Sequence, residues 1–278
     1  PASFLYDQLI APVERYGLMH EGDHVIISPA GALHGVPFAA LVESSSPNHA
    51  GRFFIEKFEL SYASSATRRV GGVRRKTNFT RSLAVVPDRA GLRFAEREAG
   101  TIPSNTFAQR RLLMDNDATA PRVLDEMSRH DLIHIAAHGK AMAHAPLHSY
   151  IQLADRKLAL NEILDRKLPS VTVILSACET GLAAGMTGDL SRGHVVVSFP
   201  IAFLSAGARA VVSPMWLVHD EATFNFMSGF YEHLSTLHST PRPLVSALAR
   251  AQREFINEEH TSRYAHPFYW AAFYHFGR

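Results

Sequence analysis

Between residues 171 and 181 the chain reads Val171-Thr172-Val173-Ile174-Leu175-Ser176-Ala177-Cys178-Glu179-Thr180-Gly181. An apolar, β-branched run stops there at small and polar residues, which predicts a buried strand of a parallel sheet. Cys178, the only cysteine in the chain, ends this run. Because ligands of open α/β sheets bind beyond the carboxyl ends of the strands, we expect the thiol of Cys178 to lie where such folds place their sites.

A second stretch has the same layout and reads Asp131-Leu132-Ile133-His134-Ile135-Ala136-Ala137-His138-Gly139. Here too an apolar run ends on a reactive side chain, His138, and a glycine follows. The segment between the two stretches leaves room for one crossover or hairpin, so both carboxyl ends can lie side by side in one sheet. We therefore expect the imidazole of His138 near the sulfur of Cys178. His134, earlier on the same predicted strand, is interpreted as a packed core histidine.

A cysteine and a histidine placed in this way can perform nucleophilic chemistry. A free thiol has a pKa near about 8.5, and a neighbouring imidazolium lowers that pKa. The imidazole can later protonate the leaving group. The backbone N–H groups of Gly139 and Cys178 are candidate donors of an oxyanion hole. A lone cysteine is also commonly a small buried hydrophobe, and the residues alone leave both interpretations open.

The composition limits the class of protein. A length of 278 residues suffices for one large α/β domain or two small ones. Hydrophobic residues at 46% and charged residues at 19% indicate a globular chain with a substantial core. The net charge of +2 is too small to indicate binding to nucleic acid or to a membrane. A single cysteine forms no internal disulfide, and no apolar run approaches the about 18 residues of a transmembrane helix.

Predicted strands alternate with predicted helices. Strands are expected at 24–28, 82–87, 107–114, 131–138, 171–178, 208–215 and 266–276, a strand or hairpin arm at 53–60, and a hairpin around Asp155-Arg156. Helices are expected at 92–101 with Glu96 and Glu98 directed outward, at 120–129, at 161–165 with Asn161 as cap, at 198–207, from Asp220 onward, and at 243–256. This alternation predicts an α/β fold with a mostly parallel sheet covered on both faces.

Several motifs in the same order resemble the CHAT domain, a family in the caspase, separase and gingipain clan (clan CD) of cysteine peptidases. The blocks that carry the resemblance are Ile26-Ile27-Ser28-Pro29, Leu33-His34, Pro37-Phe38-Ala39-Ala40-Leu41, His138-Gly139, Leu175 to Gly181, Ala202-Phe203-Leu204, Ala206-Gly207-Ala208-Arg209, Trp216 with Asp220, and His266-Pro267-Phe268-Tyr269-Trp270-Ala271-Ala272-Phe273. They cover nearly the whole chain. Ser176-Ala177-Cys178 is also similar to the caspase Gln-Ala-Cys motif.

The resemblance implies a caspase-like α/β/α sandwich, with an N-terminal subdomain at 1–115 and a catalytic half at 116–278. It implies a thiol protease in which Cys178 attacks a peptide carbonyl and His138 transfers protons, without a third catalytic residue. Ser176 is a candidate wall of the S1 pocket, which holds the P1 residue before the scissile bond. Asp220 matches an acidic position that selects a basic P1 residue. Asp220 also has a structural interpretation as a helix N-cap, and some CHAT proteases accept apolar P1 residues.

The resemblance also implies partners. We expect a protein substrate, and activation by a partner or by a fused sensing module, such as helical repeats, outside this chain. The setting that the resemblance suggests is the cytoplasm and bacterial antiviral defence, for example the processing of a gasdermin. Because the chain starts without methionine, we expect it to be a processed product or the catalytic part of a longer protein. No cofactor or metal is expected.

Two other functions remain in view. A non-catalytic scaffold is compatible with a departure from the family after Gly193, where His194 replaces the usual acidic residue and residues 187–192 look inserted. A metallohydrolase is suggested by 16 histidines, among them His134 and His138 at the four-residue spacing of helical zinc ligands. The strand pattern of that segment argues against such a metal site.

Overall fold

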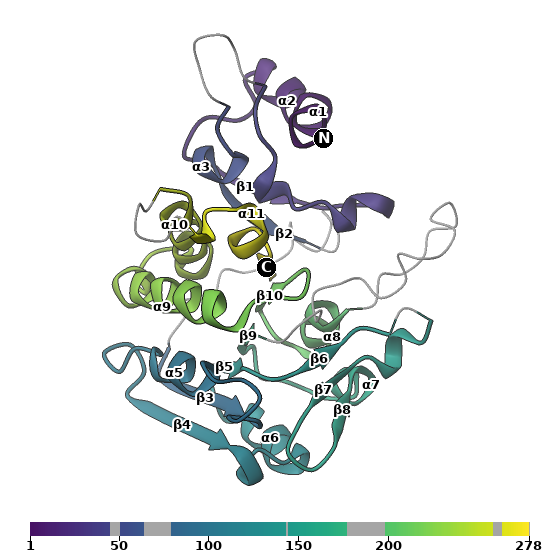
Figure 1. Cartoon of the computed structure of the whole chain (residues 1–278), viewed down its shortest axis with the longest axis vertical. Coiled ribbons are helices and arrows are strands. Elements are labelled where there is room, and N and C mark those ends of the chain that lie inside the picture. Colours follow the sequence, from purple (N-terminus) through teal and green to yellow (C-terminus); the bar gives the residue numbers. More distant parts are fainter. Residues whose placement is uncertain (45–50, 64–78, 143, 177–197, 258–262, 278) are drawn as a thin grey trace.

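The computed structural model describes residues 1–44, 51–63, 79–142, 144–176, 198–257 and 263–277. Within these residues eight strands form one sheet in the order β1-β2-β11-β10-β9-β5-β3-β4 (Figure 1). They are β1 (His24–Ile27), β2 (Glu59–Tyr62), β3 (Arg81–Val86), β4 (Gln109–Met114), β5 (Leu132–Ile135), β9 (Thr172–Leu175), β10 (Ala210–Pro214) and β11 (Phe273–Gly277). All neighbouring pairs are parallel except β10 with β11. The predicted mostly parallel sheet is confirmed.

Helices cover both faces of the sheet, which makes the fold an α/β/α sandwich (Figure 1). On one face α5 (Ala95–Gly100) contacts α9 (Asp220–Leu237), and α9 contacts α10 (Pro243–Asn257). On the other face lie α6 (Ala120–Met127), α7 (Leu160–Leu164) and α8 (Phe199–Ala206). This is the arrangement that right-handed crossovers between parallel strands produce when the strand order reverses direction.

The remaining elements lie at the edges of the sandwich. The helices α1 (Ala2–Leu9), α2 (Ala11–Arg15) and α3 (Phe54–Lys57) gather beside β1 and β2, at the top of Figure 1. A small antiparallel sheet contains β6 (Gly139–Lys140), β7 (Tyr150–Gln152) and β8 (Lys157–Ala159), and α11 (Pro267–Trp270) precedes β11. The predicted hairpin around Asp155-Arg156 is therefore confirmed. Strands from both sides of residue 115 share the main sheet, and the division into 1–115 and 116–278 stays a prediction.

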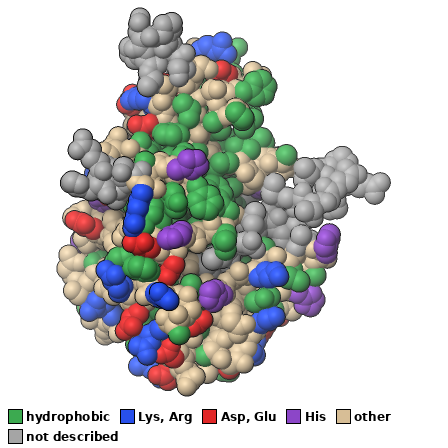
Figure 2. All heavy atoms as spheres, in the orientation of Figure 1, with side chains coloured by type: hydrophobic (Ala, Val, Ile, Leu, Met, Phe, Trp, Pro, Cys, Tyr) green, Lys and Arg blue, Asp and Glu red, His purple; other side chains and the backbone are tan. Residues whose placement is uncertain are grey.

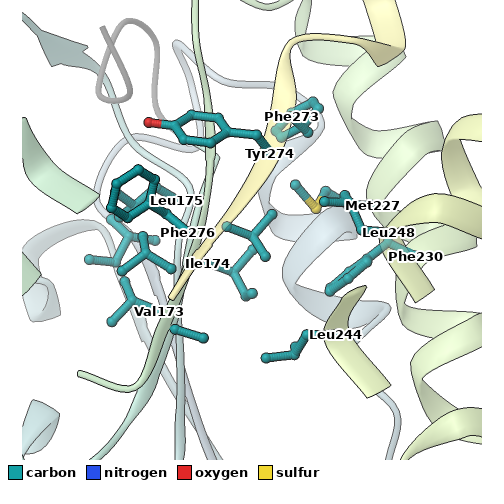
Figure 3. Close-up of a cluster of buried hydrophobic side chains, with 14 of the residues drawn as sticks. Val173, Ile174, Leu175, Met227, Phe230, Leu244, Leu248, Phe273, Tyr274 and Phe276 are labelled. Atoms are coloured by element: carbon teal, nitrogen blue, oxygen red, sulfur yellow. The ribbon is translucent and has the colours of Figure 1, made fainter. Parts of the chain in front are cut away.

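The core explains why the central strands are apolar throughout. Val173, Ile174 and Leu175 of β9 are fully buried. Ile174 faces side chains of α9 and α10, while Val173 and Leu175 point to the opposite side of the sheet, where Phe276 lies (Figure 3). A strand with both faces covered has no solvent side, so its sequence shows an apolar run instead of an alternation.

Two predicted elements at 53–60 and 266–276 are partly wrong. Residues 54–57 form the helix α3, because Phe54, Ile55 and Phe58 then bury their side chains together, and only the end of the segment joins the sheet as β2. The carboxylate of Glu56 accepts a hydrogen bond from the Phe53 N–H at 2.6 Å, which stabilises the start of this helix. At the chain end, α11 occupies 267–270 before the antiparallel strand β11 begins.

Three predicted side-chain roles are also wrong. Glu98 of α5 is directed inward, with an exposure of 2%. Asn161 is not the cap of α7, which begins at Leu160, and the Glu162 carboxylate accepts a hydrogen bond from the Ala159 N–H at 3.1 Å. At the start of α9 the N-cap is His219, whose Nδ1 accepts a hydrogen bond from the Ala222 N–H at 3.4 Å, and Asp220 is the first helical residue.

Candidate active site

His138 lies at the carboxyl edge of the sheet, just after β5. Its side chain is 51% exposed, in contrast to the fully buried strand that precedes it. The His138 carbonyl oxygen accepts a hydrogen bond from the Gln152 N–H at 2.8 Å, which ties this segment to β7. The imidazole Nε2 lies 3.6 Å from Oδ2 of Asp88. An accessible imidazole on an anchored backbone, next to a carboxylate, is suited to proton transfer.

Asp88 was not among the residues that the sequence indicated. It lies in the loop that follows β3, the neighbour of β5 in the sheet. One carboxylate oxygen, Oδ1, accepts a hydrogen bond from the Gly91 N–H at 2.8 Å, and Oδ2 faces His138. The available signal was its position directly after a third predicted strand, 82–87, because parallel strands all end at one edge of the sheet.

Cys178 lies outside the described residues, but the strand that leads to it is defined. β9 pairs with β5 in parallel, with Ile135 opposite Leu175. The Ser176 N–H donates a hydrogen bond to the Ile135 carbonyl oxygen at 2.8 Å. The chain therefore runs beside the end of β5 at a point two residues before Cys178 and three residues before His138.

Gly139 opens the short strand β6 and pairs with Ile151 of β7. The hydrogen bond from the Gln152 N–H to the His138 carbonyl oxygen shows that Gly139 and Ile151 form a non-hydrogen-bonded pair of this ladder. In such a pair both backbone N–H groups are directed away from the partner strand. The Gly139 N–H is therefore not used by the β6–β7 ladder, as an oxyanion donor requires.

Ser176 and Asp220, the two candidate S1 residues, have different surroundings. Ser176 is 8% exposed, and its Oγ has no hydrogen-bond partner among the described residues. Asp220 is half-buried, and its Oδ2 accepts a hydrogen bond from the Phe94 N–H at 3.1 Å. Because Asp88 and Phe94 belong to the same loop, His138 and Asp220 both contact the segment 88–94. One oxygen of the Asp220 carboxylate is thus already engaged by the protein.

Below the site, a buried polar cluster supports β5. His134 is fully buried, as predicted, with Nδ1 2.9 Å from the Tyr231 hydroxyl and Nε2 3.1 Å from Glu98 Oε1. Burial raises the pKa of Tyr231 well above its ordinary value of 10.0, and the charge of Glu98 raises it further. The inward direction of Glu98 follows from this contact, which joins α5 and α9 to the strand that carries His138. Among the described residues, no group of three or more His, Cys, Asp or Glu could hold a metal ion.

An apolar surface lies beyond the carboxyl end of β10. The Trp216 indole N–H donates a hydrogen bond to the Phe268 carbonyl oxygen at 2.9 Å, and the two rings stack with centroids 6.3 Å apart. Leu217 and Phe268 are 57% and 43% exposed. Figure 2 shows hydrophobic side chains gathered around α11 on this face of the molecule. Since β10 is the neighbour of β9, this surface borders the strand that leads to Cys178.

The fold is that of the caspase-like cysteine peptidases. The crystal structure of the Saccharomyces cerevisiae separase–securin complex is similar over 99% of this chain and 17% of that chain, with a TM-score of 0.60 and 13% identity. The crystal structure of the Arg specific cysteine proteinase gingipain R is similar over 82% of this chain and 56% of that chain, with a TM-score of 0.52 and 11% identity. At these identities the likeness shows the fold alone.

The family follows from the sequence comparison. The CHAT domain model matches residues 1–278, and the chain belongs to the CHAT domain family. Tetratricopeptide repeat protein 28 of Homo sapiens is 25% identical over 342 aligned residues, which cover 98% of this chain and 13% of that protein. The chain therefore spans about an eighth of the length of this relative. None of the described helices is long and apolar enough to cross a membrane.

Proposed function

We propose that this chain is a cysteine endopeptidase in which Cys178 is the nucleophile and His138 transfers protons. The observation that carries the proposal is the register of β5 and β9, two adjacent parallel strands that lead to His138 and Cys178 at one edge of the sheet. Membership of the CHAT family and the likeness to separase and gingipain R support it.

The reaction would take place in two halves. The imidazole of His138 accepts the thiol proton of Cys178, and the thiolate attacks the carbonyl carbon of the scissile peptide bond. The N–H groups of Gly139 and Cys178 hold the resulting oxyanion. The C–N bond then breaks as the imidazolium gives its proton to the leaving amine. Water, deprotonated by the same imidazole, hydrolyses the thioester and regenerates the thiol.

For the S1 pocket we propose Ser176 as a wall and Asp220 as the group that selects the P1 side chain. We assign the second oxygen of Asp220, Oδ1, to a basic P1 residue, since Oδ2 accepts the Phe94 N–H. Gingipain R, named as Arg specific, supports a basic P1 residue. The exposed Leu217 and Phe268 nearby support an apolar one instead, so P1 is a matter for direct test.

We also propose a protein substrate and an activating partner for this chain. The substrate is a specific protein, and activity is switched on by a partner or by a fused helical-repeat module. The matched region is only 13% of tetratricopeptide repeat protein 28, and the name of that protein refers to helical repeats. This similarity supports the fused module. Activation is expected because an unregulated endopeptidase would damage its own cell. The setting we propose is bacterial defence in the cytoplasm, where the enzyme processes an effector. A silent binding module is the second candidate, and the separase structure similar to this chain is that of a complex with securin.

The test is covalent labelling of Cys178 by two peptidyl chloromethyl ketones that differ only in P1, arginine or leucine. We expect labelling of the wild-type chain, loss of labelling in His138→Ala, and unchanged labelling in His148→Ala, an exposed histidine of the neighbouring segment. A preference for the arginine probe that disappears in Asp220→Asn supports the proposed pocket. The opposite result is a wild-type chain that is labelled no more than His138→Ala, both alone and as part of the full-length protein with its activator. That result would overturn the peptidase and favour the binding module.

A further inference from the structure

We propose that Asp88 is a positioning residue for His138, which holds the imidazole with its proton on Nε2 and leaves Nδ1 as the nitrogen that accepts the thiol proton of the proposed nucleophile. This role rests on the proposed peptidase function and adds a third residue to it. The starting point is the contact of 3.6 Å between Asp88 Oδ2 and His138 Nε2. When one ring nitrogen of a histidine is held by a carboxylate, the tautomer and the direction of the other nitrogen are set.

The direction of the Asp88 carboxylate is itself fixed. Its Oδ1 accepts the Gly91 N–H at 2.8 Å, and the Asp88 carbonyl oxygen accepts the Leu92 N–H at 3.1 Å. Two bonds within one turn leave Oδ2 as the oxygen that faces the imidazole. The separation of 3.6 Å is longer than a hydrogen bond. A movement of about 0.5 Å closes it, and catalytic hydrogen bonds commonly tighten only when substrate binds.

Gly91 contributes to this geometry through the space it leaves. A Cβ atom at residue 91 would lie 2.3 Å from Asp88 Oδ2, closer than real Cβ contacts. Any larger residue would therefore push the carboxylate out of its present position. The same oxygen that a side chain would displace is the one directed at His138.

The loop that carries Asp88 is anchored on both sides. Arg89 Nε donates a hydrogen bond to Asp115 Oδ2 at 2.7 Å, which joins the loop to the end of β4. The Phe94 N–H donates to Asp220 at the start of α9. A carboxylate on an anchored loop can orient a neighbouring ring, because the loop keeps its place when the ring moves. The side chains of Asp88 and His138 are 45% and 51% exposed, and ion pairs this exposed contribute little to stability.

The chemical consequence concerns the imidazolium that forms during attack. With Nε2–H directed at Asp88, the lone pair of Nδ1 is available for the thiol proton of Cys178. The positive charge that results lies beside the carboxylate, which stabilises it. In this role Asp88 acts through His138 and transfers no proton itself.

Asp88→Asn isolates this role. The amide oxygen can still accept the Gly91 N–H, so the amide NH₂ takes the place of Oδ2 and presents a donor to Nε2. That arrangement favours the proton on Nδ1, the wrong tautomer for the thiol. We expect kcat for a peptide substrate to fall by about tenfold to a hundredfold, within the range of general acid–base contributions, with KM changed less than about twofold. Asp88→Glu restores part of the rate, and Gly91→Ala lowers kcat although it leaves the charge in place.

Glu96→Gln is the matched control. It removes an exposed carboxylate that pairs with Arg89 at 3.4 Å in the same region without contact to His138, and we expect no change in kcat. The second readout is the ¹⁵N chemical shift pair of His138, assigned by its absence in His138→Ala. We expect the proton on Nε2 in the wild-type chain and a shift of the tautomer population toward Nδ1 in Asp88→Asn.

The outcomes separate the two proposals. A wild-type rate that depends on Cys178 but is unchanged in Asp88→Asn overturns the role of Asp88 and leaves the peptidase. No activity that depends on Cys178 overturns the peptidase, and the tautomer measurement still decides whether Asp88 orients the imidazole. An unchanged tautomer in Asp88→Asn contradicts the inference whatever the rate.

Discussion

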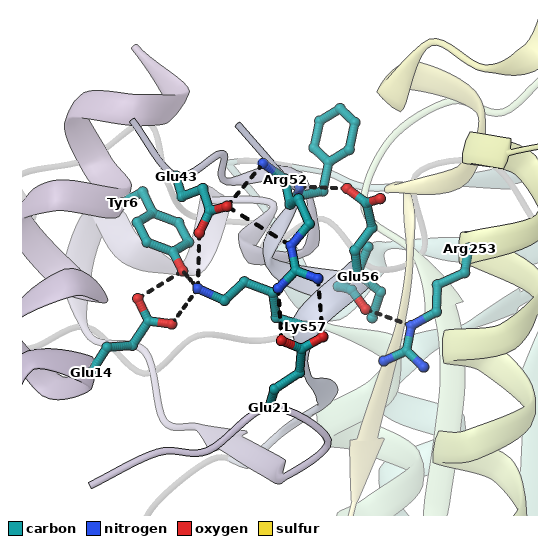
Figure 4. Close-up of polar contacts among 10 residues, drawn as sticks. Tyr6, Glu14, Glu21, Glu43, Arg52, Glu56, Lys57 and Arg253 are labelled. Carbon is teal, nitrogen blue, oxygen red and sulfur yellow. Dashed lines mark hydrogen bonds and ion pairs between the residues drawn. The ribbon is translucent and has the colours of Figure 1, made fainter. Parts of the chain in front are cut away.

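Lys57 holds the N-terminal helices onto the sandwich, and its replacement is the sharpest test of how this part of the fold is stabilised (Figure 4). Its Nζ lies 2.6 Å from Glu14 Oε1, 2.9 Å from Glu43 Oε2 and 3.0 Å from the Tyr6 hydroxyl. The side chain is only 13% exposed. Since Tyr6 and Glu14 belong to α1 and α2, one ammonium group joins both helices to α3. We predict that Lys57→Met destabilises the protein.

The magnitude follows from what the substitution leaves behind. Methionine keeps the aliphatic packing of the lysine stem, so the loss is electrostatic. Removing one partner of a fully buried ion pair costs about 3–5 kcal/mol, and a hydrogen bond to a charged group contributes about 1.5–3 kcal/mol. The carboxylates of Glu14 and Glu43 keep exposures of 22% and 32%, so water can solvate them after the change. We therefore expect a loss of about 2–3 kcal/mol in the free energy of unfolding.

The assay is urea unfolding followed by circular dichroism at neutral pH under reducing conditions. Lys167→Met, at an exposed position, is the control and should change the free energy of unfolding by less than about 0.5 kcal/mol. A double-mutant cycle with Glu43→Gln should show that the two losses are not additive. A loss in Lys57→Met no larger than in the control would refute the reasoning from these contacts.

The pH dependence of the same difference has a definite sign. Burial raises the pKa of Glu43, but the hydrogen bond and charge of Lys57 together with the contacts of Arg52 outweigh burial and lower the pKa below 4.5, so the stabilisation from Glu43 is lost as pH falls through the lowered pKa. Burial lowers the pKa of Lys57, but its acidic and phenolic partners outweigh that effect and raise it above 10.5. Burial raises the pKa of Tyr6 to about 12. The stabilisation from Lys57 and Tyr6 is present in full at neutral pH and is lost as pH rises through their raised pKa values. The effect of Lys57→Met should therefore be largest between about pH 5 and 10.

Two further substitutions test the buried supports of the sheet. Tyr231→Phe leaves His134 Nδ1 without its hydroxyl partner in a fully buried site, and we expect a loss of about 1–3 kcal/mol in urea unfolding. Tyr16→Phe, at a position 81% exposed, should have no effect, and an equal effect of both would contradict the buried cluster. Gly207→Ala places a Cβ 2.3 Å from the Leu168 carbonyl oxygen at a residue with φ of +117°, so we expect a loss of at least about 2 kcal/mol in thermal unfolding. Gly100→Ala, with no atom within 4 Å of the added Cβ, should be neutral, and similar stability of the two variants would show that the C-cap of α8 tolerates a side chain.

The candidate site was predictable in part because its signals are local. His138 and Gly139 come directly after an apolar run, and the end of such a run marks the functional edge of a parallel sheet. Ser176 could be placed for the same reason. Asp88 carries the same local signal, since it follows the predicted strand 82–87, but its contact with His138 depends on β3 lying next to β5, and strand order is not written in local sequence. Asp220 was recognised by its position after Trp216, but its hydrogen bond to the Phe94 N–H joins segments far apart in the chain.

The sequence by itself determined the α/β class, the existence of most central strands and the burial of His134, since strands covered on both faces carry a continuous apolar pattern. It misjudged Glu98, because a charged residue in a short helix carries no sign that a buried histidine of β5 lies within contact distance. Only the tertiary structure decided that Glu98 turns inward, that residues 54–57 coil into a helix, and that Asp88 faces His138. For Glu98 and Asp88 the deciding contact lies between segments distant in sequence, and for residues 54–57 the burial of Phe54, Ile55 and Phe58 overrides the strand preference of the local residues.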